Sequence, residues 1–449
     1  MNPRILPFLV LLLGATPRPL AAQLHEFGPR DRTRGAIMLS AVAHAIRTEF
    51  WDPGLKGVPF DSLVTVADSE IAHATGYGQM NGAIAKVVLA LDDSHTRFWP
   101  PSGVNRIELG WDPYAIGDSV FLDHVDPWAA APPIGLRVGD RLVAVDGWPV
   151  ERRRLFDLVY IRRYLQPQPS MVLTVERGDS TPYDVRVPSL PIPGRQYYDL
   201  SRLGEGSDWY QLIREEESAD SGWESRFAEP APTVLYWRLR TFAVSEGHVR
   251  AGLHQARGKE TLILDLRGNH GGYVNTLTAL LARVAHADQV GDTLYMVRKR
   301  EKVEAQRVER AADRERWHGR LIVLIDAESM SASEAFADVV QRLHLGTVLG
   351  DRSPGFLTEA QGFGFLTNEG SSVFYGVGIA VAMLERPDGS RVEGVGVMPD
   401  ELIQPSPDDL VLRRDPVLAR ALQIAGLPYD PVKARGYRDH GDRETRDWQ

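Results

Sequence analysis

The sequence predicts an α/β core in the second half of the chain, and two patterns carry this prediction. Continuous apolar runs of strand length stand at 234–237, 262–264 and 321–325. Apolar residues at helical spacing follow these runs at 277–284 and 336–343. Apolar strands that alternate with helices are typical of a parallel sheet covered on both faces. We therefore expect the fold class of this core to be α/β.

The first part of the chain has a helical pattern. Apolar residues recur at helical spacing between 36 and 46 and again between 84 and 91. A Pro-Pro pair at 100–101 then marks a boundary, because proline cannot continue a helix. We expect an N-terminal helical domain before this pair.

A β-rich segment separates the helical part from the core. The turn at 139–140 leads into an alternating strand, and Asp146-Gly147 is a strong hairpin signal. The pattern at 135–147 resembles the corresponding turn and strand of PDZ domains. This resemblance implies a small β-domain inserted before the core that binds an extended peptide by adding it as a strand.

The N-terminus has the pattern of a secretory signal peptide. Arg4 supplies a positive charge, 5–14 is a short apolar run, and Ala21 and Ala22 offer a cleavage site. Pro7 interrupts the apolar run, which is also too short to span a bilayer, so we expect export and no stable transmembrane anchor.

These observations divide the chain into six segments. The stretch after residue 190 is rich in proline, glycine, serine and acids, as connectors are, and the charged end of the chain has little to bury. We expect a signal peptide (1–22), an N-terminal helical domain (23–100), a PDZ-like domain (101–190), a connector (191–232), the core (233–425) and a loose C-terminal tail (426–449).

Composition excludes several classes of function. The chain of 449 residues contains no cysteine, which excludes disulfides, a thiol nucleophile and cysteine-ligated zinc. Its formal net charge of −9 argues against general nucleic-acid binding, which needs a basic surface. No group of histidine and acidic residues has metal-ligand spacing, so we expect no metal and no organic cofactor.

The segment 329–334 (Ser-Met-Ser-Ala-Ser-Glu) lies between the apolar run 321–325 and a helix-like stretch. At such a junction the amides of the helix start create positive potential, which favours the oxyanion formed when a serine attacks a carbonyl. Residues 331–334 also fit a Ser-x-x-Glu capping box, which requires no catalysis. Taken alone, the segment favours the cap, because caps are far commoner than nucleophiles.

Three further motifs accompany this serine. Residues 264–272 place Gly271 and Gly272 after a strand, where paired glycines let backbone N–H groups approach a ligand. Asp-Ser-His-Thr at 93–96 follows a helix, and Glu-Gly-Val-Gly-Val-Met-Pro-Asp at 393–400 lies near the end of the core. Each of them alone also fits an ordinary turn.

Together, and in this order, the motifs resemble the S41 serine peptidases, the family of the carboxyl-terminal processing (tail-specific) proteases and the tricorn core protease. The resemblance implies a ClpP-like or crotonase-like α/β core with Ser331 as the nucleophile. It also implies an oxyanion hole made by the amide of Ala332 and an amide of Gly271 or Gly272.

The general base departs from the tail-specific pattern. Those proteases use a Ser–Lys dyad, with the lysine after a Gly-x-x-x-x-Gly segment, but here Phe356 follows the segment 350–355. No lysine occurs between Lys302 and Lys433. Arg352 cannot replace it, because a guanidinium does not release its proton near neutral pH.

The tricorn-type branch of the family uses a histidine instead. The pair Ser94-His95 matches its Ser-His pair, and Glu393 matches its glutamate. A histidine is a competent base for a serine hydroxyl when its second ring nitrogen is oriented. Our hypothesis is that His95 takes the proton of Ser331 and that Ser94 and Glu393 orient it. His270, beside the glycine pair, is the reserve candidate.

The sequence therefore predicts an exported serine endopeptidase, periplasmic or secreted, that acts on polypeptides through C-terminal or extended segments. Its PDZ-like domain would assist substrate recognition. Two alternatives stay open. One is a non-catalytic ligand- or peptide-binding protein on the same fold, as in the retinoid-binding proteins that resemble this family. The other is a scaffold that binds peptides without turnover. The oligomeric state is left open.

Overall fold

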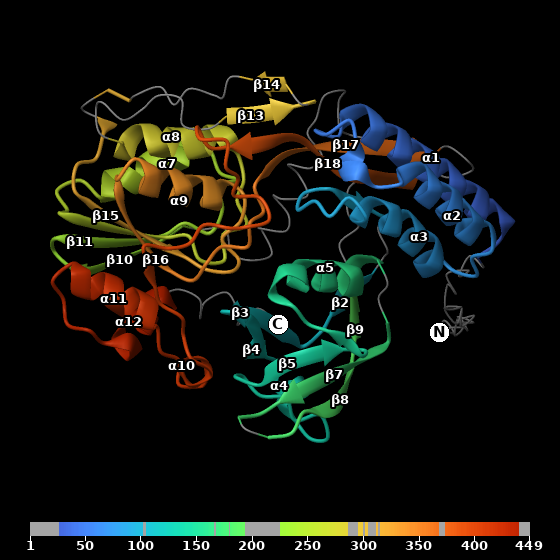
Figure 1. The fold of residues 1–449 in the computed structure, drawn as a ribbon. Coiled ribbons are helices and arrows are strands. Elements are labelled where there is room, and N and C mark those ends of the chain that lie inside the picture. Colours follow the sequence, from blue (N-terminus) through green and yellow to red (C-terminus); the bar gives the residue numbers. More distant parts are fainter. Residues whose placement is uncertain are drawn as a thin grey trace, which may run out of the picture.

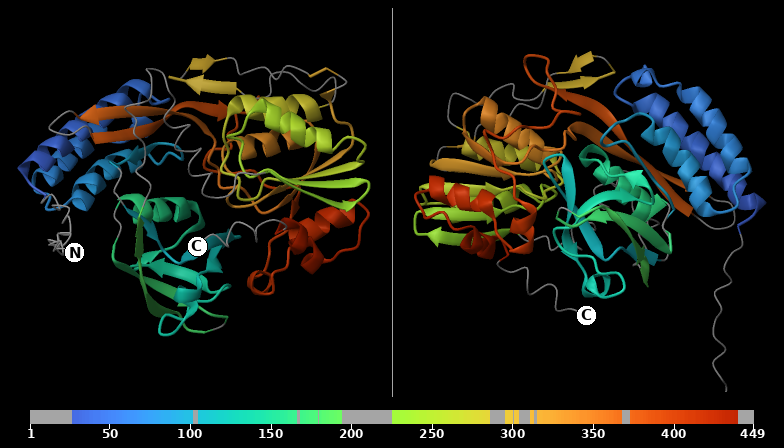
Figure 2. Two further views of the ribbon diagram at one scale, coloured as in Figure 1. Left: turned by 180° about the vertical axis from the view of Figure 1, so that it is seen from behind. Right: turned by 60° about the horizontal axis from the view of Figure 1, so that its bottom comes forward.

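The computed structural model describes residues 27–101, 105–165, 168–178, 180–193, 225–285, 295–299, 301–303, 311–312, 315–367 and 373–439. The predicted signal peptide and most of the predicted connector lie outside the described residues. Figures 1 and 2 show three parts: an α/β core, a group of N-terminal helices, and a β-domain that lies between them.

The core contains a six-stranded sheet in the order β10-β11-β12-β15-β16-β19. Its strands are β10 (Arg226–Ala231), β11 (Val234–Arg238), β12 (Thr261–Asp265), β15 (Arg320–Ile325), β16 (Gly346–Gly350) and β19 (Glu401–Leu402). All neighbours pair in parallel except β10, which is an antiparallel edge strand. The predicted parallel α/β core is confirmed, and the antiparallel edge was not predicted.

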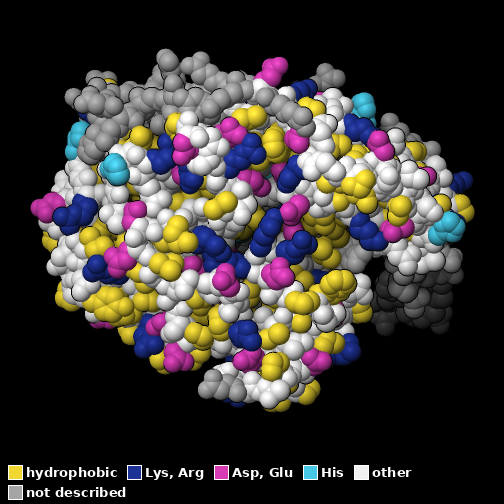
Figure 3. Space-filling model, in the orientation of Figure 1, with side chains coloured by type: hydrophobic (Ala, Val, Ile, Leu, Met, Phe, Trp, Pro, Cys, Tyr) yellow, Lys and Arg dark blue, Asp and Glu magenta, His cyan; other side chains and the backbone are white. Residues whose placement is uncertain are grey.

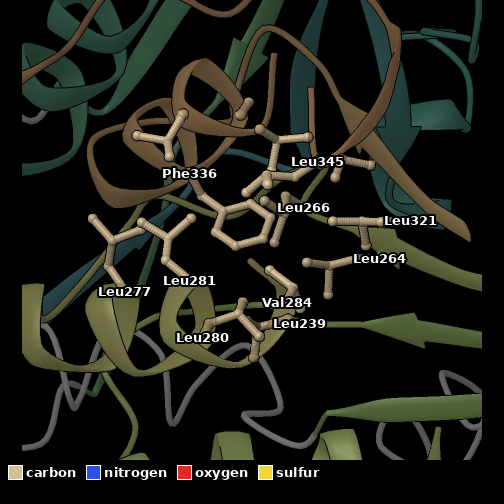
Figure 4. Packing of buried hydrophobic residues seen from close by; sticks show 14 of the residues in the cluster. Leu239, Leu264, Leu266, Leu277, Leu280, Leu281, Val284, Leu321, Phe336 and Leu345 are labelled. Carbon is tan, nitrogen blue, oxygen red and sulfur yellow. The ribbon is translucent and has the colours of Figure 1, made fainter. Parts of the chain in front are cut away.

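Helices cover both faces of this sheet. One face carries α7 (Glu246–Gln255), α8 (Val274–Val284) and α9 (Ala332–Arg342); the other carries α11 (Pro416–Ile424) and α12 (Pro431–Arg438). Figure 4 shows Leu277 and Leu281 of α8 beside Phe336 of α9, with Leu264 of β12 nearby. All four side chains are buried, and burial of each contributes about 1.5–3 kcal/mol of hydrophobic free energy.

The prediction of a loose tail over 426–449 is wrong for the part that the structure describes. Residues Pro431–Arg438 form α12, which Asp430 caps by accepting a hydrogen bond from the Lys433 amide at 2.9 Å. Ala434 is completely buried against the core. The helix forms because the apolar contacts of Ala434 and Tyr437 and the cap outweigh the high charge of the segment. Residues 440–449 lie outside the described residues.

The N-terminal helices share their core with a second sheet, most of whose strands come from the second half of the chain. These helices are α1 (Pro29–Glu49), α2 (Phe60–Ala72) and α3 (Tyr77–Leu89), with the short turn η1 (Leu55–Gly57). The sheet contains β1 (Arg97–Trp99), β13 (Tyr295–Arg298), β14 (Glu301–Val303), β17 (Thr358–Thr367) and β18 (Val373–Glu385). Met38 and Ile84 pack in one cluster with Val377 and Ile379. The long β17–β18 ribbon therefore ties the helices to the core (Figure 1).

The β-domain is an antiparallel sheet with short helices. Its strands are β3 (Trp111–Ile116), β4 (Ser119–Val125), β5 (Arg141–Val145), β6 (Trp148–Pro149), β7 (Ser170–Glu176) and β8 (Tyr183–Pro188), beside the pair β2 (Asn105–Glu108) and β9 (Leu190–Pro193). Its helical elements are α4 (Pro127–Ala130), η2 (Arg152–Arg154), α5 (Leu155–Tyr160) and η3 (Ile161–Leu165). The predicted hairpin is confirmed: Asp146 and Gly147 have φ of 50° and 80°, and Val145 pairs with Trp148.

The β-domain is fixed to the core by a buried ion pair. Arg152 of η2 lies 2.7 Å from the carboxylate of Asp351, and both side chains are less than a tenth exposed. The same guanidinium donates to the Gly117 carbonyl at 2.6 Å. Figure 3 shows basic and acidic side chains gathered around the middle of this face of the molecule. Among the described helices, none is long and apolar enough to cross a membrane.

Candidate active site

Three loops meet at the carboxyl edge of the core sheet. They are 266–272 after β12, 326–331 after β15 and 351–357 after β16. Because β12, β15 and β16 run parallel and in register, their carboxyl ends lie side by side. This edge is where open α/β sheets place ligands and reacting groups.

Ser331 stands at the N-cap of α9 with strained backbone angles. Its φ of 55° and ψ of −116° lie in a region that side chains other than glycine rarely adopt. Such a conformation costs about 1–3 kcal/mol and persists only when its surroundings enforce it. The Ser331 amide donates to the Phe356 carbonyl at 2.9 Å and to the Glu334 carboxylate at 3.2 Å. Both halves of the Ser-x-x-Glu capping box are present, with the Ser331 side chain facing the backbone of Glu334 and the Glu334 carboxylate accepting from the Ser331 amide.

Glu334 is fully buried and holds the neighbouring loop. Its carboxylate accepts hydrogen bonds from the Ser353 hydroxyl at 2.6 Å and from the amides of Gly355 and Phe356 at 2.7 Å each. Burial raises the pKa of Glu334 to about 7, although these hydrogen bonds oppose the rise. The sequence contained the signal for this residue, the glutamate of the Ser-x-x-Glu pattern, but only its capping role was recognised.

The glycine turn lies directly against the serine. Gly271 has φ of 91°, and a Cβ on it would stand 2.6 Å from the Cβ of Ser331. A Cβ on Gly272, whose φ is 149°, would stand 2.1 Å from the amide nitrogen of Ala243. Only glycine fits at either position.

The amides of this turn differ in their hydrogen bonds. The Gly271 amide already donates to Asn269 Oδ1 at 2.8 Å, while its carbonyl accepts from Phe242 at 2.8 Å. Within the described ranges, the amides of Gly272 and Ala332 donate to no protein acceptor. These two amides are therefore the ones available to a developing oxyanion.

Asp265 and Arg267 of the same motif have a structural role. The Arg267 guanidinium lies 2.6 Å from Asp265 and 2.8 Å from Asp415, and all three side chains are buried. Arg267 lowers the pKa of Asp265, although burial alone would raise it. The three residues fasten the glycine turn to the start of α11.

Ser94, His95 and Glu393 form a second group. The Ser94 hydroxyl lies 2.8 Å from His95 Nδ1 and donates to Glu393 Oε2 at 3.0 Å. Asp93 shapes this loop by accepting from the amides of His95 and Thr96 at 3.1 and 3.0 Å. His95 is buried, with 8% of its surface exposed.

Glu393 connects the two groups. The Leu357 amide donates to Glu393 Oε2 at 2.6 Å, while the preceding residue, Phe356, accepts from the Ser331 amide and donates to Glu334. Burial, and then the nearby charge of Asp93, raise the pKa of Glu393 to about 7. Two carboxyl groups, the buried Glu334 and the partly buried Glu393, thus hold one stretch of backbone between the serine and the histidine.

Phe356, at the position of the lysine in the Ser–Lys pattern, acts here through its backbone. Its ring packs edge-on against Phe156 of the β-domain, with centroids 6.0 Å apart. His270, the reserve base, has an exposed side chain beside Gly271. In the described part of the chain, no group of three or more histidine and acidic residues could hold a metal ion.

Residues 233–403 match the model of peptidase family S41. A chloroplastic C-terminal processing peptidase from Tetradesmus obliquus is 26% identical over 372 residues, covering 74% of this chain and 70% of the relative. A carboxyl-terminal-processing protease from Synechocystis sp. is 24% identical over 337 residues, covering 72% and 70%. Mature CPAF, solved in complex with lactacystin, shares the fold, with a TM-score of 0.62 at 13% identity over 92% of this chain and 98% of that chain.

The family model and both relatives agree on the class of protein: this chain is a serine-type peptidase. More particularly, its segment 233–403 belongs to peptidase family S41.

Proposed function

We propose that this peptidase is an exported serine endopeptidase of the Ser-His branch, with Ser331 as nucleophile and His95 as general base. The observation that carries the proposal is the Ser94–His95–Glu393 group. It occupies His95 Nδ1 with a hydroxyl that is itself bonded to the partly buried carboxylate of Glu393. Phe356 supports the choice, because this chain has no lysine where the Ser–Lys branch needs one.

The reaction follows from these roles. Ser331 Oγ attacks the carbonyl carbon of the scissile bond while His95 Nε2 takes the hydroxyl proton. The amides of Ala332 and Gly272 stabilise the oxyanion. As the C–N bond breaks, His95 returns the proton to the leaving amine. Water then attacks the acyl-enzyme carbonyl while His95 takes a proton from the water. Ser331 leaves as His95 returns the proton to its oxygen.

The substrates we propose are polypeptides presented as extended or C-terminal segments. The two relatives are named as C-terminal processing enzymes, and the β-domain has the small antiparallel sheet and flanking helix expected of a PDZ-like module. Such a module adds a peptide as a further strand. The signal-peptide pattern at 1–22 supports export to the periplasm or outside the cell.

Hydrolysis of an unfolded protein substrate tests the assignment. Ser331→Ala and His95→Ala should each lower kcat by at least about 10³-fold with unchanged thermal unfolding, because nucleophile and base act as a unit. His270→Ala is the matched comparison and should keep activity. Activity retained in His95→Ala, or lost only in His270→Ala, contradicts the proposed base.

A non-catalytic peptide-binding protein is the second candidate, and the phenylalanine at position 356 is the observation that favours it. This candidate predicts that the wild-type protein binds an extended peptide and never cleaves it. Turnover that disappears in Ser331→Ala eliminates the candidate.

A further inference from the structure

A second hydroxyl lies at the general base. Thr358 Oγ1 stands 3.1 Å from His95 Nδ1, and Thr358 is buried, with 3% of its surface exposed. We propose that Thr358 is a positioning residue whose hydroxyl shares the Nδ1 proton of His95 with Ser94 and so fixes the ring for catalysis. This inference rests on the proposed function, in which His95 is the base.

The available protons define the tautomer. Ser94 has one hydroxyl proton and gives it to Glu393 Oε2. Toward His95 Nδ1 it therefore presents a lone pair, so Nδ1 carries the ring proton and Nε2 carries the ring lone pair. The Nδ1 proton then lies between two hydroxyl oxygens, at 2.8 Å from Ser94 and 3.1 Å from Thr358.

Strands β17 and β18 of the second sheet place Thr358 beside His95. Thr358 begins β17 and pairs with Met383 of β18, while Arg97 of β1 pairs with Gly378 of the same strand. The Ala380 amide of β18 donates to Thr96 Oγ1 at 3.1 Å. β18 therefore holds both the histidine loop and the threonine. A register shift follows at Glu359 and Ala360, and such bulges redirect nearby side chains.

The neighbouring backbone links Thr358 to the other catalytic contacts. Leu357, directly before it, donates its amide to Glu393, and Phe356 accepts from the Ser331 amide. Three consecutive residues thus contact the nucleophile, the carboxylate and the base. The hydrogen bonds of Phe356 and Leu357 therefore restrict the position of Thr358 as well.

The expected role is in the chemical step. When His95 takes the proton of Ser331, the ring becomes a cation, and a second acceptor at Nδ1 stabilises it more than it stabilises the neutral ring. Loss of this acceptor should lower kcat and leave KM unchanged, because Thr358 contacts the base.

Thr358→Val replaces the hydroxyl by a methyl of similar size and is the principal test. We expect kcat for peptide hydrolysis and the rate of inactivation by a fluorophosphonate both to fall about tenfold, with KM within about twofold of wild type. Thr358→Ser keeps the hydroxyl and should recover most of the loss. Thr261→Val is the matched control. Thr261 is also buried but lies at the start of β12, away from the candidate site, so this variant should keep both rates.

The outcomes separate this inference from the proposed function. Wild-type rates in Thr358→Val overturn the role of the hydroxyl. Wild-type rates in Thr358→Val with a loss in Thr358→Ser indicate that packing of the methyl group matters instead. If Thr358→Val does not fold, Thr358→Ala takes its place. We expect the same losses of kcat and of the inactivation rate in that variant. If His95→Ala is inactive while Thr358→Val is fully active, only the inference about Thr358 fails. If His95→Ala is active, the proposed base itself fails.

Discussion

At the scale of single residues, Glu393 determines the geometry around His95, the proposed base. Its carboxylate accepts three hydrogen bonds, from the amide and hydroxyl of Ser94 and from the Leu357 amide. An ionised carboxylate accepts at both oxygens, whereas a protonated one must use one oxygen as a donor. The arrangement of Ser94 and His95 therefore depends on the charge of Glu393.

The activity should depend on pH through this group. The pKa of Glu393 is raised to about 7 by burial and by Asp93. Above that pH the carboxylate is ionised and orders Ser94 and His95; as pH falls through about 7 it is protonated and this order is lost. We expect an acid limb of kcat/KM with a midpoint close to 7, measured by initial rates between pH 5 and 9.

Glu393→Gln is the corresponding variant, since it is uncharged at every pH. At pH 8 it should have kcat/KM roughly 10²–10⁴-fold below wild type, as expected for the loss of a group that orients a catalytic histidine. Wild-type activity of this variant at pH 8 would show that the charge of Glu393 has no part in the reaction.

At the scale of elements, Glu334 joins the start of α9 to the loop after β16. A group whose pKa rises from 4.5 to about 7 on folding binds a proton in the folded state that the unfolded chain releases between these values. Its contribution to stability is present below pH 4.5 and is lost as pH rises to about 7, by roughly 3 kcal/mol over this interval.

Urea unfolding at pH 5 and pH 8 measures this effect. The wild-type protein should lose roughly 3 kcal/mol more stability between these pH values than Glu334→Gln. The glutamine can alter stability at both pH values, but it has no proton to release. Equal pH dependence in the two proteins would contradict the buried, proton-binding Glu334.

The elements also show what the sequence could and could not predict. Apolar runs such as 321–325 predicted the core strands because strands buried on both faces leave a continuous pattern. The motifs around Ser331 and His95 were recognisable because each is local. Thr358 was missed, since its contact with His95 spans 263 residues and a threonine at a strand start has no local signature. The helix α12 was missed because its stability comes from burial of Ala434 against the core.

At the scale of the whole molecule, two charged contacts of unequal burial join the β-domain to the rest of the chain, one to the core and one to the end of the N-terminal helices. The Arg152–Asp351 pair is buried, whereas the Arg153–Asp92 pair beside it is more than half exposed at both side chains. Removal of one partner of a buried pair leaves the other charge without compensation, and loss of an exposed pair costs little.

Arg152→Met and Arg153→Met form a matched pair for comparing these two contacts. The first should destabilise the protein by about 3 kcal/mol and the second by less than about 1 kcal/mol, measured by urea unfolding at pH 8. Limited proteolysis should also cut Arg152→Met sooner between the β-domain and the core. Equal stability of the two variants would mean that the buried pair does not hold the domains together.

The central claim is that His95 activates Ser331, and the most direct measurement is covalent labelling by a fluorophosphonate with the modified peptide identified by mass spectrometry. We predict an adduct on Ser331 in the wild-type protein, and a labelling rate at least about 10³-fold lower in His95→Ala. An adduct on another serine, or labelling of Ser331 at the same rate without His95, would contradict the account.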